Sequence, residues 1–179
     1  MIKIKSSIRL NAIEPADYRV HYELMQRIYP SAFAYMWSDD GAWYVKRIHE
    51  KSALLLDLKV PDSSYHHVYF REKLVGILRL KFAELSPDFP NQPALKIDRV
   101  YLDDNVRGEG LGTKLIDYAK EEARRRGKKI LWLERMDTNE ATINFYRKCG
   151  FVDGSSFRLT FPLLREEFRG MHRMSWRVE

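Results

Sequence analysis

Apolar and polar residues along the chain form short strand-like runs and longer helical repeats. Residues 97–102 are rich in β-branched and aromatic side chains, as a buried strand requires. Residues 103–110 are polar and glycine-rich. The apolar positions that follow recur at helical spacing, at Leu111, Leu115, Ile116, Ala119 and Ala123. The pattern therefore predicts a strand, a glycine-rich turn and a helix.

A second strand is predicted downstream of this helix. Residues 129–136 contain a near-continuous apolar run, which is typical of a strand covered on both faces. The two strands and the helix between them form a βαβ unit, so the strands are expected to be parallel neighbours. A short helix is predicted over residues 139–149, with Asp137 or Thr138 as its cap and a glycine at its end.

The N-terminal third predicts a strand over residues 7–13 followed by helices. Pro15 suits the first turn of a helix, and Pro30 is expected to stop that helix. A second helical region, in two pieces, is predicted after Ser38. The carboxylates of Asp39 and Asp40 suit its N-terminus, and this capping role is favoured over attraction of a cationic amine.

Residues 66–82 predict a β-hairpin with its turn at residues 71–73. Gly76, inside the second strand of the hairpin, is expected to mark a bulge or the close approach of a cofactor. The remaining segments are predicted to be a loop over 86–93 and two strands over 155–161 and 170–178.

The order of predicted strands and helices indicates an α/β (α+β) protein, and the length suits a single domain over residues 1–179. Hydrophobic residues make up 45% of the chain, enough for a real core. Cys149 is the only cysteine, which excludes an internal disulfide and suits a reducing compartment. With no apolar run at the N-terminus and none near the length of a membrane span, a soluble cytoplasmic protein with no membrane partner is expected.

The formal net charge of +6 raises the question of a nucleic-acid partner. Much of the surplus lies in residues 124–129, at the end of the predicted long helix, where cations complement the helix dipole. A solvated helix end is therefore favoured over help in holding phosphates, and nucleic-acid binding is the poorer third option. His66 and His67 lack further ligands at suitable spacing, so no metal is expected.

The glycine turn carries the strongest chemical signal. Gly108, Gly110 and Gly112 remove the Cβ atoms that would keep a ligand from the backbone. The free N–H groups and positive dipole end of the following helix favour a phosphate or pyrophosphate. Arg107 adds a fixed positive charge, and the side chain of Glu109 is expected to point outward. The G-x-G-x-G spacing matches neither the P-loop nor the dinucleotide fingerprint.

Two ordered motifs resemble the GCN5-related N-acetyltransferase (GNAT) superfamily. Residues 107–112, Arg-Gly-Glu-Gly-Leu-Gly, are similar to its R/Q-x-x-G-x-G/A pattern, and residues 139–151 are similar to its N-x-x-A-x-x-F-Y-x-K-x-G-F pattern, with Thr142 in place of the usual alanine. The resemblance covers residues 66–152 well. It implies the GNAT fold, a mixed central β-sheet splayed between the fourth and fifth strands and flanked by helices.

The resemblance also implies that acetyl-CoA is the acetyl donor. Val100 or Tyr101 would offer its backbone N–H to the thioester oxygen, and Tyr146 would protonate the leaving thiolate. The cofactor-binding residues implied are Val100, Tyr101, Leu102, Arg107, Gly108, Glu109, Gly110, Leu111, Gly112, Thr113, Asn139 and Tyr146. Asn139 would hold the pantetheine through its side-chain amide, and its alternative role is a helix cap. The alternative role for Tyr146 is packing on the helix.

An amine acceptor must lose a proton before it attacks. With an amine pKa of about 10.4, exposing the lone pair at pH 7 costs about 4.6 kcal/mol. Asp98 and Glu134 are candidate bases, directly or through water, because burial in apolar strands would raise their pKa. Either carboxylate could instead be paired, with Arg99 or Arg135. Cys149 has no histidine or asparagine nearby in the sequence to support a nucleophilic role.

The predicted function is acetyl transfer from acetyl-CoA to an amine by direct attack in a ternary complex. The alternatives are a catalytically silent acyl-CoA-binding module and a basic RNA-associated factor. Residues 132–134, Trp-Leu-Glu, with the following motif are similar to the polyamine N-acetyltransferase branch. This similarity makes a di- or polyamine the first candidate acceptor, while other small amines, peptide amines and amino sugars stay open. An aromatic wall for a cation or an apolar substrate stem could be formed by Tyr35, Trp37, Trp43 and Tyr44, but ordinary packing in the core is the favoured interpretation. A homodimer is common in the family.

Overall fold

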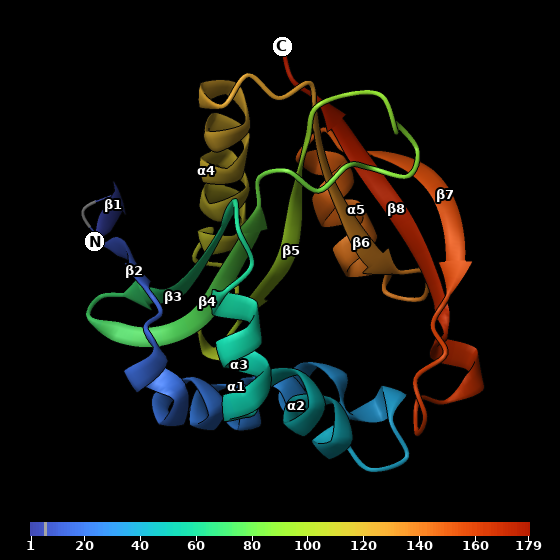
Figure 1. The fold of residues 1–179 in the computed structure, drawn as a ribbon. Helices are drawn as coiled ribbons and strands as arrows, with labels where there is room; N and C mark the ends of the chain where they lie inside the picture. Colours follow the sequence, from blue (N-terminus) through green and yellow to red (C-terminus); the bar gives the residue numbers. More distant parts are fainter. Residues whose placement is uncertain (6) are drawn as a thin grey trace.

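A mixed β-sheet forms the centre of the molecule, and helices cover both of its faces (Figure 1). The computed structural model describes residues 1–5 and 7–179. Within them the sheet has the strand order β1-β2-β3-β4-β5-β6-β8-β7. The strands are β1 (Ile2–Lys5), β2 (Ile8–Ala12), β3 (Ser63–Phe70), β4 (Lys73–Lys81), β5 (Ala94–Leu102), β6 (Ile130–Met136), β7 (Val152–Arg158) and β8 (Gly170–Arg177).

Five α-helices are present among the described residues. They are α1 (Tyr18–Phe33), α2 (Ala42–His49), α3 (Lys51–Leu58), α4 (Leu111–Arg125) and α5 (Glu140–Lys148). Short 3-10 helices η1 (Pro15–Asp17), η2 (Ala34–Met36), η3 (Asp104–Val106) and η4 (Glu166–Phe168) lie in the connections. No helix in the described ranges has both the length and the apolar character needed to cross a membrane.

The only parallel pair in the described sheet is β5 with β6, as the βαβ prediction required. The two strands pair from Ala94 opposite Ile130 to Ile97 opposite Leu133, and then diverge while both continue. The predicted splay is therefore confirmed between β5 and β6 (Figure 1). They are the fifth and sixth strands because β1, which was not predicted, adds a strand at the start of the chain.

Alternation along the strands gives the sheet one core on each face. On one face, Leu78 and Leu80 of β4 pack in a cluster with the apolar residues of α4, including Leu115. On the other face, Ile77 packs in a second cluster with residues of α1, including Met25. The predicted apolar stripe of α4 is thus the side that covers the sheet, and α1 to α3 close the opposite face.

Two predicted helix boundaries were wrong. Pro30 does not stop α1, which runs on to Phe33. Pro30 sits in the last turn, so its missing N–H removes one hydrogen bond close to the helix end, and its fixed φ is still helical. At α5, Asn139 is the cap rather than Asp137 or Thr138, because its side-chain oxygen accepts a hydrogen bond from the Thr142 N–H at 2.9 Å.

The predicted hairpin is confirmed as β3 and β4, which are joined at Arg71 and Glu72, both with positive φ. Gly76 lies beside a register irregularity in this pair. A Cβ at Gly76 would lie 2.2 Å from the carbonyl oxygen of Tyr101 in β5. The close approach at Gly76 is therefore between β4 and β5. The structure gives the glycine this role in strand packing and not the contact with a cofactor that was the other expectation.

Replacing Gly76 by alanine should destabilise the fold, because β5 must move away from β4 to admit the methyl group. We expect a loss of about 2–3 kcal/mol in unfolding free energy, the upper part of the usual range for overpacking. Urea unfolding measures it. The control is Gly127→Ala, where φ is +62° and no atom lies within 4 Å of the added carbon, with an expected cost of about 1 kcal/mol. Equal losses for the two variants would contradict the packing explanation.

Candidate active site

A cavity of about 510 Å³ opens where β5 and β6 diverge. One part of its lining comes from β5, β6, α4 and α5, and includes Asp98, Val100, Leu102, Gly112, Glu134, Asn139, Thr142, Phe145 and Tyr146. The other part comes from α1, η2, α2 and the segment after β7, and includes Tyr29, Phe33, Trp37, Tyr44, Leu159 and Phe161. The cavity therefore joins the two predicted motifs to the N-terminal helices.

The glycine turn leads directly into α4. Gly108 and Gly110 have φ of +83° and +72°, a region that favours glycine, and an added Cβ would meet no atom within 4 Å at either. Gly110 immediately precedes the helix, so the N–H groups of Leu111, Gly112 and Thr113 have no partner within α4. Exposed amides at a positive helix end form a cradle for an anion.

The charged side chains of the turn form ion pairs with other residues. Glu109 pairs with Arg71 of the β3–β4 turn at 3.4 Å, which agrees with the outward orientation expected for it. Arg107 is largely exposed and pairs with Asp104. Leu111 is buried under the sheet, so only its backbone is available to a ligand.

The free edge of β5 presents alternate backbone groups to the cavity. The Asp103 N–H donates to the Val75 carbonyl of β4 at 2.8 Å. Because backbone groups alternate along a strand, those of Tyr101 also face β4, and those of Val100 and Leu102 face the divergence from β6. This alternation favours Val100 over Tyr101 as the donor toward a ligand in the cavity.

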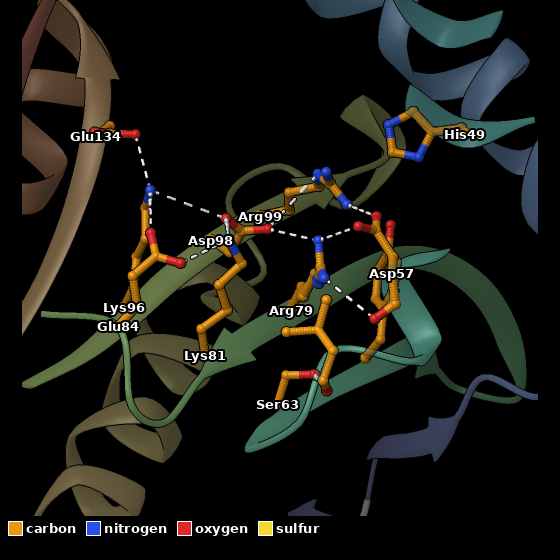
Figure 2. Close-up of polar contacts among 12 residues, drawn as sticks. His49, Asp57, Ser63, Arg79, Lys81, Glu84, Lys96, Asp98, Arg99 and Glu134 are labelled. Atoms are coloured by element: carbon orange, nitrogen blue, oxygen red, sulfur yellow. Dashed lines mark hydrogen bonds and ion pairs between the residues drawn. The ribbon is translucent and has the colours of Figure 1, made fainter. Parts of the chain in front are cut away.

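Asp98 lies in a dense group of cations (Figure 2). Its carboxylate is 3.1 Å from Arg79 Nη1 and 3.2 Å from Lys81 Nζ, with Arg99 Nε at 3.9 Å and Lys96 Nζ at 4.0 Å. Burial acts to raise the pKa of Asp98, but the combined effect of these cations lowers it. The expectation that burial would raise this pKa was wrong, because sequence spacing did not reveal that Arg79 and Lys81 of β4 join the cations of the same strand around Asp98.

Glu134 also lines the cavity but has fewer cations around it. Its Oε2 is 3.0 Å from Lys96 Nζ and its Oε1 is 3.7 Å from Arg173 Nε. Its side chain is 26% exposed, against 11% for Asp98. Arg135, one of the partners considered for these carboxylates, pairs with Asp153 instead. Glu134 is therefore the more accessible of the two candidate bases.

Tyr146 and Asn139 come to the cavity from the two ends of α5. Burial raises the pKa of Tyr146, so its phenol stays neutral and can donate a proton. Asn139 caps α5 through its oxygen, which leaves its side-chain N–H groups outside that bond. Cys149 is half-buried in the core, where burial raises the pKa of its thiol. That position agrees with a packing role.

Sequence reasoning missed the buried cluster that joins α3 to the sheet. Arg79 is 2% exposed and binds Asp57 at 2.7 Å as well as Asp98, and Arg99 also pairs with Asp57. A charged residue inside the apolar run of β4 was a visible signal for Arg79. Its partner on α3 lies 22 positions away, and no local pattern connects the two residues.

The basic end of α4 is largely neutralised within the helix. Arg125 and Arg126 pair with Glu122 at 2.7 Å and 3.0 Å, and Arg124 pairs with Glu121 at 3.6 Å. These pairs support the helix-end interpretation of the positive charge.

Divergent parallel strands, a glycine turn that leads into a helix and a cavity at the divergence together define the α/β architecture of this chain. The chain belongs to the acetyltransferase (GNAT) family, whose model matches residues 22–151. It is 27% identical over 114 residues to an uncharacterized N-acetyltransferase of Lactobacillus delbrueckii subsp. lactis, covering 64% of this chain and 66% of that protein. It is also 39% identical over 71 residues to the streptothricin acetyltransferase of Streptomyces lavendulae, covering 40% of this chain and 37% of that protein.

A solved structure supports the fold over almost the whole chain. The PaiA N-acetyltransferase of Thermoplasma acidophilum, in complex with coenzyme A, superposes with a TM-score of 0.72 and 17% identity. The superposition covers 96% of this chain and 99% of that one. At this identity the likeness shows the fold alone, and the match to the first curated relative spans just under two thirds of that protein's length.

The cation group around Asp98 predicts a pH-dependent loss on substitution. Asp98→Asn removes one of the two carboxylates that Arg79 contacts, so we expect about 3 kcal/mol less unfolding free energy at pH 7. Because the pKa of Asp98 is lowered in the folded state, its contribution is complete above about pH 4 and is lost as the pH falls further. The difference from the unsubstituted protein should therefore be smaller at pH 3 than at pH 7.

Urea unfolding at pH 7, 5 and 3 checks this result. Glu121→Gln is the matched control, because its pair with Arg124 is exposed, and it should cost less than about 1 kcal/mol at every pH. A loss in Asp98→Asn that does not change between pH 7 and pH 3 would show that charge is not its cause.

Proposed function

We propose that the protein transfers an acetyl group from acetyl-CoA to an amine by direct attack within a ternary complex. The observation that carries this proposal is one continuous cavity at the divergence of β5 and β6. In support of the proposal, the lining includes residues of the free edge of β5, the carboxylates of Asp98 and Glu134 and the phenol of Tyr146, and it meets the start of α4 at Gly112.

The residues present suit acetyl-CoA as the donor. The amides of residues 110–113 favour its pyrophosphate, and the absence of side chains at Gly108 and Gly110 lets a phosphate approach the backbone. The N–H groups of Val100 and Leu102 lie along the free edge of β5, where the amide-rich pantetheine arm can pair like an added strand. Asn139 adds side-chain N–H groups. The donor supplies an acetyl thioester, which an amine lone pair can attack.

Glu134 is the residue we assign to proton removal from the acceptor. It must help supply the roughly 4.6 kcal/mol needed to deprotonate an amine at pH 7, directly or through a water molecule. The lowered pKa of Asp98 makes it a poor base, and we assign to it the holding of Arg79 and Arg99 in place. The two candidates left open by the sequence thus receive different roles.

The backbone N–H of Val100 is assigned to the thioester oxygen, on which negative charge develops during attack. A donor fixed by the strand needs no reorganisation at that moment. Tyr146 is assigned to protonation of the departing thiolate, because its phenol is held neutral by burial. A thiol with a pKa near 8.5 already leaves readily, so the contribution of Tyr146 is expected to be modest.

The competing function is an acyl-CoA-binding module without catalysis. It is favoured by one observation: both cavity carboxylates already form ion pairs with lysine or arginine. Such a module binds CoA through the same turn but transfers nothing.

Donor binding can be tested with a matched pair of glycines at the two ends of α4. Gly110→Ala and Gly127→Ala both place a side chain at a positive φ with no atom within 4 Å, so their stability costs should be similar. Only Gly110 borders the proposed phosphate site. We expect Gly110→Ala to weaken CoA binding at least about tenfold, or about 1.4 kcal/mol, and Gly127→Ala to change it less than twofold. Calorimetric titration with CoA measures both, and equal affinities would argue against the site.

Catalysis predicts acetyl-CoA-dependent thiol release in the presence of an amine. Tyr146→Phe should lower kcat by about 10–100-fold, the low end for a proton-transfer group, with little change in the KM for acetyl-CoA. Tyr118→Phe is the control, since Tyr118 lies on α4 outside the cavity lining. Tight CoA binding without thiol release from any amine would instead establish the silent module.

A further inference from the structure

We propose that the acceptor is a small monoamine with an aromatic or other apolar body, and that this body binds among the aromatic residues at the helical end of the cavity. This inference rests on the proposed function and specifies its second substrate. The term aromatic chamber is used here for Tyr29, Phe33, Trp37, Tyr44, Tyr101 and Phe161, all of which line the cavity.

The aromatic chamber draws its rings from four separate segments of the chain. Tyr29 stacks on Tyr44 with ring centroids 4.5 Å apart, and Phe33 meets Tyr101 edge to face at 5.8 Å. Trp37 lies against Phe161 at 6.2 Å. Such contacts hold the rings in fixed orientations. A rigid apolar wall of this kind favours a ligand that offers a matching apolar surface.

Four of these rings keep part of their surface open to the cavity. Phe33, Tyr44, Tyr101 and Phe161 are half-buried. Behind them Trp37 is buried and donates from Nε1 to the Tyr29 hydroxyl at 3.1 Å. The inner layer is therefore satisfied by its own hydrogen bond, and the outer rings are left for a ligand.

The charges of the cavity disfavour an acceptor with a second ammonium group. Asp98 and Glu134 are the carboxylates that line it, and both are paired with cations of neighbouring strands. Asp57, just behind them, is held by Arg79 and Arg99. A polyamine would place its second ammonium among rings with no free carboxylate in the described lining, and burying an unpaired charge is costly.

The phenols of the aromatic chamber do not supply the missing negative charge. Burial raises the pKa of Tyr29 and Tyr101, so both stay neutral at physiological pH. The hydroxyls of Tyr44 and Tyr101 are 3.0 Å apart and hydrogen-bond to each other. They offer polarity to a ligand without offering an anion.

Backbone pairing joins two segments that carry residues of the cavity lining, Met36 and Trp37 on one side and the chain that follows Phe161 on the other. The Ser38 N–H donates to the Leu163 carbonyl at 2.9 Å, and the Arg165 N–H donates to the Met36 carbonyl at 2.9 Å. This contact, here called the strap, joins the segment after α1 to the loop between β7 and β8 (Figure 1). The size of the acceptor is limited by the volume of the cavity, because about 510 Å³ must hold the acetyl end of the donor as well as the acceptor.

The test is calorimetric titration of the CoA-loaded full chain with 2-phenylethylamine, hexylamine, putrescine and spermidine. We expect the two apolar monoamines to bind at least tenfold more tightly than putrescine or spermidine. Equal or tighter binding of either polyamine would overturn the inference. Tighter binding of a peptide with N-terminal phenylalanine than of 2-phenylethylamine would overturn the assignment to small acceptors.

Binding and turnover separate this inference from the proposed function. If 2-phenylethylamine binds selectively but acetyl-CoA releases no thiol with any amine, the proposed function fails while the binding preference holds. If thiol is released fastest with spermidine, the proposed function holds and the inference fails.

Phe161→Ala locates the bound body, with Tyr35→Ala as its control. Tyr35 is 48% exposed and packs on Phe168 rather than lining the cavity. Phe161→Ala should weaken 2-phenylethylamine binding at least tenfold and leave CoA affinity within twofold, while Tyr35→Ala should change neither. If Phe161→Ala does not fold, Phe161→Leu replaces it with a smaller expected loss of about threefold. Unchanged amine affinity in a folded Phe161 variant would overturn the placement.

Discussion

The divergence of β5 from β6 is the constraint on which the rest of the structure depends. Two parallel strands that pair only as far as Ile97 and Leu133 leave backbone N–H and C=O groups without sheet partners beyond that point. Lys96 bridges to Glu134 at 3.0 Å beside the last paired residues, and the absence of a side chain at Gly76 lets β4 hold β5 from its other edge. The cavity thus lies between two strands whose positions are fixed by the Lys96–Glu134 ion pair and by β4.

A buried ionic cluster fixes β4 and β5 to α3 (Figure 2). Arg79, at 2% exposure, could not remain charged there without Asp57 and Asp98. The cluster has a chemical consequence as well as a structural one, because carboxylates engaged with internal cations are poor partners for a cationic ligand. The paired carboxylates and the aromatic rings therefore both favour an apolar ligand over one that carries several positive charges.

Local patterns in the sequence predicted the parts of the fold that depend on neighbours in the chain. The spacing from Leu111 to Ala123 predicted α4, and the apolar run around Trp132 predicted the parallel partner of β5. Pro30 misled because a proline near a helix end costs little. The lowered pKa of Asp98 could not be predicted, because spacing along the chain does not show that two cations of its own strand and two cations of β4 converge on it. Contacts distant in sequence need the assembled sheet.

The strap between residues 36–38 and 163–165 holds these two segments together without using the side chains that line the cavity. Its hydrogen bonds run from backbone to backbone, as between Ser38 and Leu163, so they persist whatever side chains stand on either segment. Substitutions at lining positions such as Phe33 or Phe161 can then accumulate without altering the spacing of the two segments that the strap joins. Backbone pairing of this kind allows the side chains that line the cavity to change while the strap itself stays the same.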